Sequence, residues 1–314
     1  MKRRLPVAIS CLKPPHKGSP VSEQGRPIPI SYHFDFTGVE DFHEYRFDVN
    51  GIPQVYYGRS IGWQYNAITV AQYGLARLTA WESSGQDEEL ARARGAGRWL
   101  VEHCEEHRRQ VGAWIYRFDL PFYGPKAPWI SAMAQGEAIS LLLRLWLLDA
   151  QEEYLQVARK AIRAFLLPTE KGGVLSSFPD GRPVFEEFPT VPPPHVLNGH
   201  IFALLGVYDF WKVTGEQGAG ELFSGAVQGL KENLWRYDLG WWTLYDLHPT
   251  RRLASRAYQR IHMRLMHVLY RLTGDDVFAQ WEARWRGYLA SPVSAARWAA
   301  AKVVEKARLR RYHG

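Results

Sequence analysis

The chain has only two cysteines in 314 residues, Cys11 and Cys104, so it can build neither a disulfide framework nor a cysteine-based metal cluster. Two isolated thiols favour a reducing compartment. No apolar run approaches the roughly 18 residues that a membrane span requires. The apolar run after the basic N-terminus meets prolines too early for a secretion signal. These absences predict a soluble, cytoplasmic protein.

Motifs of several enzyme classes are missing as well. The sequence has no glycine-rich phosphate loop, no HExxH zinc motif and no Cys/His ligand spacing. It also lacks the GxSxG nucleophile elbow. We therefore expect no nucleotide or nicotinamide cofactor and no bound metal.

The net charge of +7 lies at the two ends of the chain. Residues 1–27 carry a formal charge of +5 and residues 281–314 one of +6, which leaves −4 for the body between them. A basic total therefore gives no reason to expect nucleic acid as a partner. Solvated basic ends are the simplest interpretation, and peripheral contact with an anionic membrane surface is the alternative.

A fourfold repeat dominates the remaining pattern. Segments that open with small or polar residues and then become apolar nearly all round recur about every 60–70 residues, at 64–81, 133–148, 198–211 and 258–271. Such segments are typical of buried inner helices. A charged, amphipathic segment follows each one, at roughly 86–108, 150–166, 218–235 and 275–290. The alternation predicts a mainly α protein, an α/α toroid that forms an incomplete barrel of about four helical hairpins.

Glycine- and aromatic-rich pieces separate the hairpins and begin at Gly112, Gly172 and Gly240. We expect short β-hairpins or loops there, gathered at one end of the toroid where they would frame a cleft. The 13 Trp, 16 Tyr and 14 Phe suit a protein that stacks sugar rings, and they also fill cores. We predict an extended arm and β-hairpin over residues 1–60, an α/α-barrel catalytic domain over 61–290 and a basic C-terminal helix over 291–314.

Two adjacent carboxylates, Glu186 and Glu187, precede a proline-rich turn that leads to Asn198 at the start of an inner helix. Neighbouring side chains of extended backbone point to opposite faces, so only one of the two can face a given cleft. A carboxylate among aromatics is partly desolvated, which raises its pKa and makes it a better base. Helix capping or pairing with arginine is the structural alternative.

A second group of candidates lies nearer the C-terminus. The piece after Gly240 contributes Tyr245, Asp246 and His248, and Tyr258 opens the last inner helix with His262 four residues later. The N-terminal helix dipole favours the phenolate form of a tyrosine placed there. Ordinary core tyrosines with satisfied hydroxyls are the structural alternative.

These motifs, in this order, resemble those of D-glucuronyl C5-epimerases. The resemblance runs from about residue 45 to 290 and rests mainly on WISAMAQGEAISLLLR from Trp129 and FEEFPTVPPPHVLNGH from Phe185. It implies an α/α barrel that inverts C5 of glucuronic acid in heparan-type glycan chains to give iduronic acid. The implied partner is an anionic, uronate-containing glycan, and the family suggests a homodimer.

The resemblance also implies roles for individual residues. Glu187 and Tyr258 would act as acid and base on opposite faces of the sugar, with Tyr245 as a further catalytic tyrosine and Asn198 as a hydrogen-bond donor to the substrate. The C5 proton lies α to a carboxylate, so the site must stabilise a second negative charge on that group. The other predicted substrate-binding residues are His248, Arg59, Gln64, Gln135, Glu186 and His262.

Two positions depart from the family pattern. Phe188 stands where a tyrosine usually follows the glutamate pair, and Tyr245-Asp-Leu-His248-Pro stands where Tyr-Asp-Leu-Arg-His is common. An imidazole thus replaces a guanidinium that could clamp the uronate carboxylate. The predicted acid/base pair is unaffected.

Three alternatives stay open. A uronate lyase begins with the same proton abstraction and then expels the 4-substituent. A glycoside hydrolase needs two facing carboxylates, for which Glu186, Glu187 and Asp246 are the central candidates. A non-catalytic glycan-binding protein is favoured by Phe188 and His248.

Overall fold

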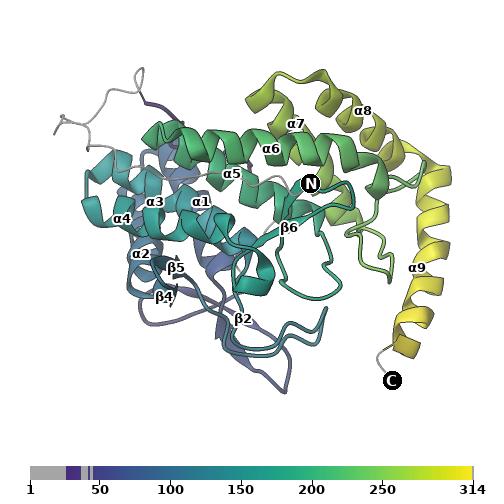
Figure 1. Cartoon of the computed structure of the whole chain (residues 1–314), viewed down its shortest axis with the longest axis horizontal. Helices are drawn as coiled ribbons and strands as arrows, with labels where there is room; N and C mark the ends of the chain where they lie inside the picture. The colour runs from purple at the N-terminus through teal and green to yellow at the C-terminus, as the bar shows by residue number, and fades with distance from the viewer. Residues whose placement is uncertain (1–25, 37–41, 43–44, 313–314) are drawn as a thin grey trace, which may run out of the picture.

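The computed structural model describes residues 26–36, 42 and 45–312. The basic N-terminal stretch with Cys11 lies outside the described residues, and so do the predictions made for it. Within the described part, four helical hairpins follow one another along the chain and curve into an incomplete toroid (Figure 1). This architecture confirms the predicted mainly α fold.

Each hairpin pairs an inner helix with an outer one. The inner helices are α1 (Ala67–Ser84), α3 (Ala132–Asp149), α5 (Leu197–Thr214) and α7 (Arg256–Thr273). The outer helices are α2 (Asp87–Glu102), α4 (Glu152–Ala161), α6 (Gln217–Asn233) and α8 (Asp276–Ala290). Short 3-10 helices follow α4 and α6: η3 (Ile162–Leu166), η4 (Thr169–Lys171) and η5 (Leu234–Tyr237). The bounds lie within a few residues of those predicted, except that the first outer helix ends early and a strand follows it.

A left-handed residue ends each inner helix and turns the chain back. Gly85, Gly215 and Gly274 adopt φ values of 69°, 71° and 70°, and Ala150 has the same conformation at 51°. Glycine has no Cβ to clash in this region, which explains its use at three of the four turns. Each outer helix then begins two residues later, so the hairpins are tight.

The helices α3 and α5 cross closely and run parallel. A Cβ on Gly206 would lie 2.2 Å from the carbonyl oxygen of Gly136, so the two backbones are in direct contact at this crossing. Further along both helices, Arg144 pairs with Asp209 at 2.5 Å, and both side chains are fully buried. Because the contacts advance together along the two helices, their N-terminal ends lie at the same end of the toroid.

Three small antiparallel sheets include the predicted N-terminal β-hairpin and the pieces at Gly112 and Gly172, whereas the piece from Gly240 forms isolated β-bridges. One contains β1 (Arg46–Phe47), β2 (Pro53–Tyr56) and β3 (Trp63–Tyr65). The second pairs β4 (Glu105–Arg108) with β5 (Val111–Ala113), and the third pairs β6 (Leu175–Ser177) with β7 (Pro183–Phe185). Residues 26–36, part of the predicted extended arm, pair with no strand among the described residues. Their alternate side chains are buried, and His33 contacts Asp209 of α5 at 2.6 Å, so the arm is held by packing.

The last hairpin is less buried than the sequence predicts. Helix α7 buries only one side of its surface, whereas α3 and α5 are buried along most of their length. Figure 1 shows α7 and α8 at one end of the curved array, so no further hairpin covers them. None of the described helices is long and apolar enough to cross a membrane.

The C-terminal helix α9 (Pro292–Tyr312) is docked onto a loop rather than extended into solvent. Trp298 donates to the carbonyl of Ala254 at 3.0 Å, and Lys302 donates to that of Leu253 at 2.7 Å. Glu305 accepts from the backbone N–H of Leu253 at 2.9 Å. Part of the basic C-terminus therefore braces the loop that precedes α7.

The crossing of α3 and α5 gives a stability prediction. We expect Gly206→Ala to lower the free energy of unfolding by about 2–3 kcal/mol, because the added methyl group collides with backbone that cannot rotate away. The control is Gly287→Ala in α8, where a Cβ meets nothing within 4 Å; it should stabilise the protein by about 0.5–1 kcal/mol. Urea denaturation of both variants measures the difference, and equal stabilities would contradict the close crossing.

Candidate active site

The starts of the inner helices gather around one group of polar side chains. The backbone N–H of Ala132 at the start of α3 donates to the carbonyl of Glu186 at 2.9 Å. The N–H of Leu197 at the start of α5 donates to the carbonyl of Tyr245 at 3.2 Å, and the rings of Tyr245 and Tyr258 in α7 lie 4.6 Å apart. The loops before α5 and α7 are thereby fixed to helix ends, whose dipoles favour negative charge.

Glu187 is buried at this end, with 7% of its surface exposed. Its carboxylate lies against the first turn of α5: a Cβ on Gly199 would be 2.3 Å from Glu187 Oε2. This oxygen has no hydrogen-bond partner among the described residues. Burial, followed by the charges of Glu186 and Asp246, raises the pKa of Glu187 to about 8. Glu187 therefore exchanges a proton near neutral pH, unlike an ordinary glutamate.

Glu186 has a different environment. Its carboxylate accepts from the backbone N–H of His195 at 3.0 Å and contacts the ring of the same histidine. The carbonyl of His195 in turn accepts from the hydroxyl of Tyr237 at 2.7 Å. Glu186 thus holds the proline-rich turn in place, and its oxygens are occupied by protein donors.

Tyr245 and Tyr258 form an edge-to-face pair at an interplanar angle of 65°. Tyr258 lies in the first turn of α7, where its N–H donates to Oγ of the capping residue Ser255 at 3.2 Å, and 37% of its surface is exposed. Burial raises the pKa of Tyr245 well above 10, and the charge of Glu187 and the neighbouring Tyr258 raise it further. Tyr245 is therefore a neutral phenol that faces both Glu187 and Tyr258.

Two further polar side chains next to Tyr245 lack partners for one atom each. Asn198, the second residue of α5, is buried, and its Oδ1 has no hydrogen-bond partner among the described residues. His262 contacts Thr243 Oγ1 through Nδ1 at 3.1 Å, and its Nε2 is buried without a partner in the same residues. Burial lowers the pKa of His262 to about 3, so the imidazole is neutral. Its ring lies 6.5 Å from that of Tyr245 and nearly parallel to it.

A tyrosine–asparagine–tyrosine chain also borders Glu187 and is absent from the sequence prediction. Asn66, the capping residue of α1, donates to the hydroxyl of Tyr57 at 2.7 Å and accepts from that of Tyr116 at 2.6 Å. Burial raises the pKa of both tyrosines, and the charge of Glu187 adds to the rise. In the sequence, Asn66 is recognisable only as an asparagine directly before a helical pattern. That pattern predicts a helix cap and gives no indication of a link between two tyrosines.

Several predicted substrate-binding residues do not join this group. Gln135 is fully buried and donates to the carbonyls of Gly112 and Ala161 at 3.0 and 3.1 Å, so it joins elements of the core. Gln64 donates to the carbonyl of Ile61 within the β2–β3 hairpin, and Arg59 lies exposed in the turn of the same hairpin. The amide of Gln135 therefore has a structural role, because protein atoms satisfy it.

Arg252, a residue that the sequence analysis did not single out, lies beside Tyr245. Its Nε and Nη2 donate to one carboxylate oxygen of Asp246 at 3.0 and 2.6 Å. Its Cζ lies 3.5 Å from the ring centre of Phe122, 4.2 Å from that of Tyr123 and 5.4 Å from that of Tyr245. Nη1 makes no hydrogen bond within the described part of the chain. No motif marks this position, because the contact depends on the path of the loop before α7.

The two residues that depart from the family pattern lie against the same wall. The ring centre of Phe188 is 4.9 Å from that of Tyr123, and the ring centre of His248 is 5.6 Å from it. His248 Nδ1 contacts the hydroxyl of Thr250 at 2.8 Å, and burial lowers the pKa of this imidazole. His248 is therefore neutral and packed, and it is a poor substitute for a guanidinium.

The hydrogen bonds of the three central carboxylates bear on whether the site could hydrolyse a glycoside. Of the three central carboxylates, Glu186 and Asp246 accept hydrogen bonds from protein donors, which leaves Glu187 as the one with an unbonded oxygen. A pair of facing, available carboxylates, as glycoside hydrolysis requires, is thus absent from the described residues. The same residues contain no cluster of three or more His, Cys, Asp or Glu side chains suited to a metal ion.

Comparison with solved structures identifies related folds. A cellobiose 2-epimerase from Bacillus thermoamylovorans superposes with a TM-score of 0.54 at 12% identity, covering 79% of this chain and 67% of that one. A sugar epimerase from a ruminal bacterium gives a TM-score of 0.54 at 14% identity, covering 80% and 68%. At these identities the likeness concerns the fold, and it agrees with the α/α toroid.

Comparison of sequences gives closer relatives. An uncharacterised protein of Methanocaldococcus jannaschii is 29% identical over 255 residues, which are 75% of this chain and 82% of that protein. A D-glucuronyl C5-epimerase of Caenorhabditis elegans is 36% identical over 214 residues, 62% of this chain, and the chain spans about a third (34%) of its length. The family model described as D-glucuronyl C5-epimerase C-terminus matches residues 108–287, more than half of the chain. The chain therefore belongs to the D-glucuronyl C5-epimerase C-terminal family, as its motifs predicted, and with it to the isomerases that act on carbohydrates.

Proposed function

We propose that this protein is a uronate C5-epimerase that converts D-glucuronic acid units of a glycan to L-iduronic acid. It would remove the C5 proton from one face of the sugar and return a proton to the other. The observation that supports this most directly is the buried Glu187 carboxylate, with one oxygen unbonded and a pKa of about 8, at the end of the toroid that also holds the Tyr245–Tyr258 pair.

Proton abstraction at C5 makes a specific demand on the site. As the C5–H bond breaks, its electron pair moves toward C6 and the substrate carboxylate becomes a dianion. Glu187 and Tyr258 are proposed as the two groups that exchange protons with C5, one on each face. A base works best when its pKa lies near the working pH, which favours Glu187 over an ordinary exposed glutamate. Tyr258 is partly exposed and would exchange its proton with solvent.

Stabilisation of the dianion is assigned to hydrogen-bond donors and positive charge. The neutral phenol of Tyr245 and the side chain of Asn198 would donate to the carboxylate oxygens, near the N-terminal ends of α5 and α7. Arg252 is proposed to supply the guanidinium that the sequence lacks at position 248. Asp246 fixes its orientation from one side and two aromatic rings cover its faces, which leaves Nη1 for an anionic ligand.

The acid/base assignment predicts the loss of isotope exchange. In deuterated water with glucuronate-containing oligosaccharides, the wild type should incorporate deuterium at C5, visible by NMR. We expect Glu187→Gln and Tyr258→Phe each to slow the incorporation by about 10²–10⁴-fold. The matched control is Tyr270→Phe, also on α7 and also 37% exposed, which should retain wild-type exchange.

The same experiment separates the alternative activities. Exchange that survives both active-site changes would overturn the assignment of Glu187 and Tyr258. An unsaturated product absorbing in the ultraviolet would indicate a lyase. Tight oligosaccharide binding without exchange would indicate a glycan-binding protein.

The raised pKa of Glu187 predicts a pH dependence. Glu187 must be ionised to accept a proton, while the tyrosine keeps the proton that it donates. Protonation of Glu187 below pH 8 therefore removes the active form of the enzyme. We expect kcat/KM for exchange to fall about tenfold per pH unit below pH 8 and to level off above it. Initial rates between pH 4 and 9.5 measure this fall, and a fall that begins only near pH 4.5 would show that Glu187 is not the titrating group.

The proposed role of Arg252 is tested by a paired change. Because Arg252→Gln alone would leave Asp246 buried and unpaired, we combine it with Asp246→Asn, which keeps a neutral hydrogen-bonding pair. We expect KM for the uronate substrate to rise by about 10–100-fold with a smaller change in kcat. Arg284 offers the control, because its Nε and Nη2 bind Asp238 in the same way and its guanidinium lies near two aromatic rings, but its side chain is 51% exposed. The Arg284→Gln/Asp238→Asn pair should leave KM unchanged, and an equal rise in both pairs would argue against a role for Arg252 in binding.

A further inference from the structure

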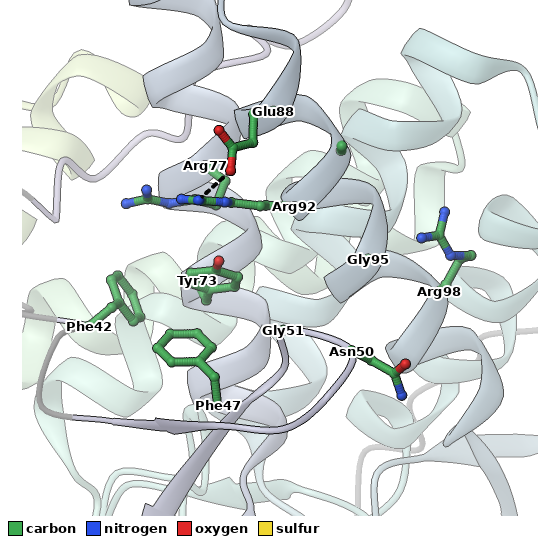
Figure 2. Close-up of a pocket in the computed structure, with 11 residues that line it drawn as sticks. Phe42, Phe47, Asn50, Gly51, Tyr73, Arg77, Glu88, Arg92, Gly95 and Arg98 are labelled. Carbon is green, nitrogen blue, oxygen red and sulfur yellow. Dashed lines mark hydrogen bonds and ion pairs between the residues drawn. The ribbon is translucent and has the colours of Figure 1, made fainter.

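We infer that the chain has a second glycan-binding site, which holds an anionic sugar unit of the same polymer several units away from the one at Glu187. The site is a cavity of about 640 Å³ between the turn that joins β1 to β2 and the outward sides of α1 and α2 (Figure 2). Its size is within the range of small-molecule sites. The inference rests on the proposed function, because it takes the substrate to be a uronate polymer.

The residues of the acid/base group do not line the cavity. Tyr73 and Arg77 of this helix line the cavity. The adjacent residues Gln72 and Gly74 face the opposite way and pack on α3, where Gln72 donates to Glu137 at 3.0 Å. Neither Glu187 nor the tyrosines of the first site line the cavity. It is therefore a separate site on another side of the same helix.

Aromatic rings form one wall of the cavity. The rings of Phe47 and Tyr73 lie 5.3 Å apart, and Phe47 is an exposed residue of β1. The guanidinium of Arg77 lies 5.4 Å from the ring centre of Tyr73 on its other side (Figure 2). An exposed ring beside a cation suits a sugar, because the apolar face of a pyranose packs on an aromatic face while its polar groups bind the charge.

The charges of the cavity favour an anion. Arg77 pairs with Glu89 at 3.0 Å, and Arg92 pairs with Glu88 at 2.6 Å, so both guanidinia are held in place from one side. Arg98 also lines the cavity and makes no hydrogen bond or ion pair with the other described residues. Three arginines and two glutamates leave one positive charge without an ion-pair partner in the described part of the chain. The guanidinium of Arg98 is therefore suited to a carboxylate or sulfate.

Gly95 lines the cavity and packs against no neighbouring element of the described chain. It lies in the middle of α2 between Arg92 and Arg98, where glycine costs a helix about 1 kcal/mol relative to alanine. A Cβ on Gly95 would meet nothing within 4 Å, so no neighbouring element requires the glycine. The open space at its Cβ lies between the two arginines that line the cavity.

Strand β2 connects the two sites. Gly51, in the turn before β2, lines the cavity, and Tyr57, directly after β2, borders Glu187. From Gly51 to Tyr57 the extended chain advances six residue steps, or about 20 Å. Several linked sugar rings cover that length, so one polymer can occupy both sites, and the second contact raises the affinity for long chains.

The test compares oligosaccharides of two lengths. Binding of a glucuronate-containing disaccharide and of a dodecasaccharide is measured by calorimetry, using Glu187→Gln as the background so that no turnover interferes. We expect Gly95→Leu, which places a side chain in the cavity, to weaken dodecasaccharide binding by about tenfold and to leave disaccharide binding unchanged. Arg98→Ala should act in the same direction. Gly287→Leu is the matched control, since Gly287 is also a helix residue with open space at its Cβ.

The outcomes distinguish this inference from the proposed function. If the wild type exchanges deuterium at C5 but Gly95→Leu binds both lengths as well as Gly287→Leu does, the second site is wrong and the epimerase assignment stands. If no exchange occurs and the length effect is still lost in Gly95→Leu, the cavity binds the glycan and the catalytic proposal fails. Gly95→Ala guards against misfolding: it should bind normally and unfold at a higher temperature.

Discussion

The contact between the Glu187 carboxylate and Gly199 is the constraint on which the chemistry of this site depends. Any side chain at position 199 would occupy the place of the carboxylate oxygen, so glycine allows the carboxylate to sit against the start of α5. Burial there, with no donor on one oxygen, raises the pKa of Glu187 to about 8. A buried, unpaired carboxylate destabilises a fold, and the closely packed core of α3 and α5 offsets that cost.

The rest of the structure holds partners around this carboxylate from loops that are distant in sequence. The β2–β3 hairpin and the start of α1 bring Tyr57 and Asn66, and the loop before α7 brings Tyr245. That loop is braced from behind by α9, whose Lys302 and Glu305 bind both backbone groups of Leu253. The C-terminal helix, which the charge pattern alone presented as a solvated tail, therefore helps to position Tyr245.

The sequence predicted the helices well and the site only in part. Inner helices that are apolar nearly all round, each ended by a left-handed residue, can be read from local pattern alone. Gln135 was misassigned because a buried polar residue at a helix start has the same sequence pattern whether it binds substrate or, as here, backbone carbonyls. Arg252 and the Tyr57–Asn66–Tyr116 chain were missed because their contacts join segments that no local pattern connects.

Hydrogen bonding separates the structural polar groups from those available to a ligand. The side chains of Glu186, Gln135 and Asp246 are buried and bonded to protein donors or acceptors, as nearly all buried polar groups are. Glu187 Oε2, Asn198 Oδ1 and His262 Nε2 are among the buried side-chain atoms that have no partner in the described residues. Each such group costs about 1–3 kcal/mol when left unpaired. In the proposed function, the hydroxyl and carboxylate groups of an anionic sugar would complete the bonding of these three atoms.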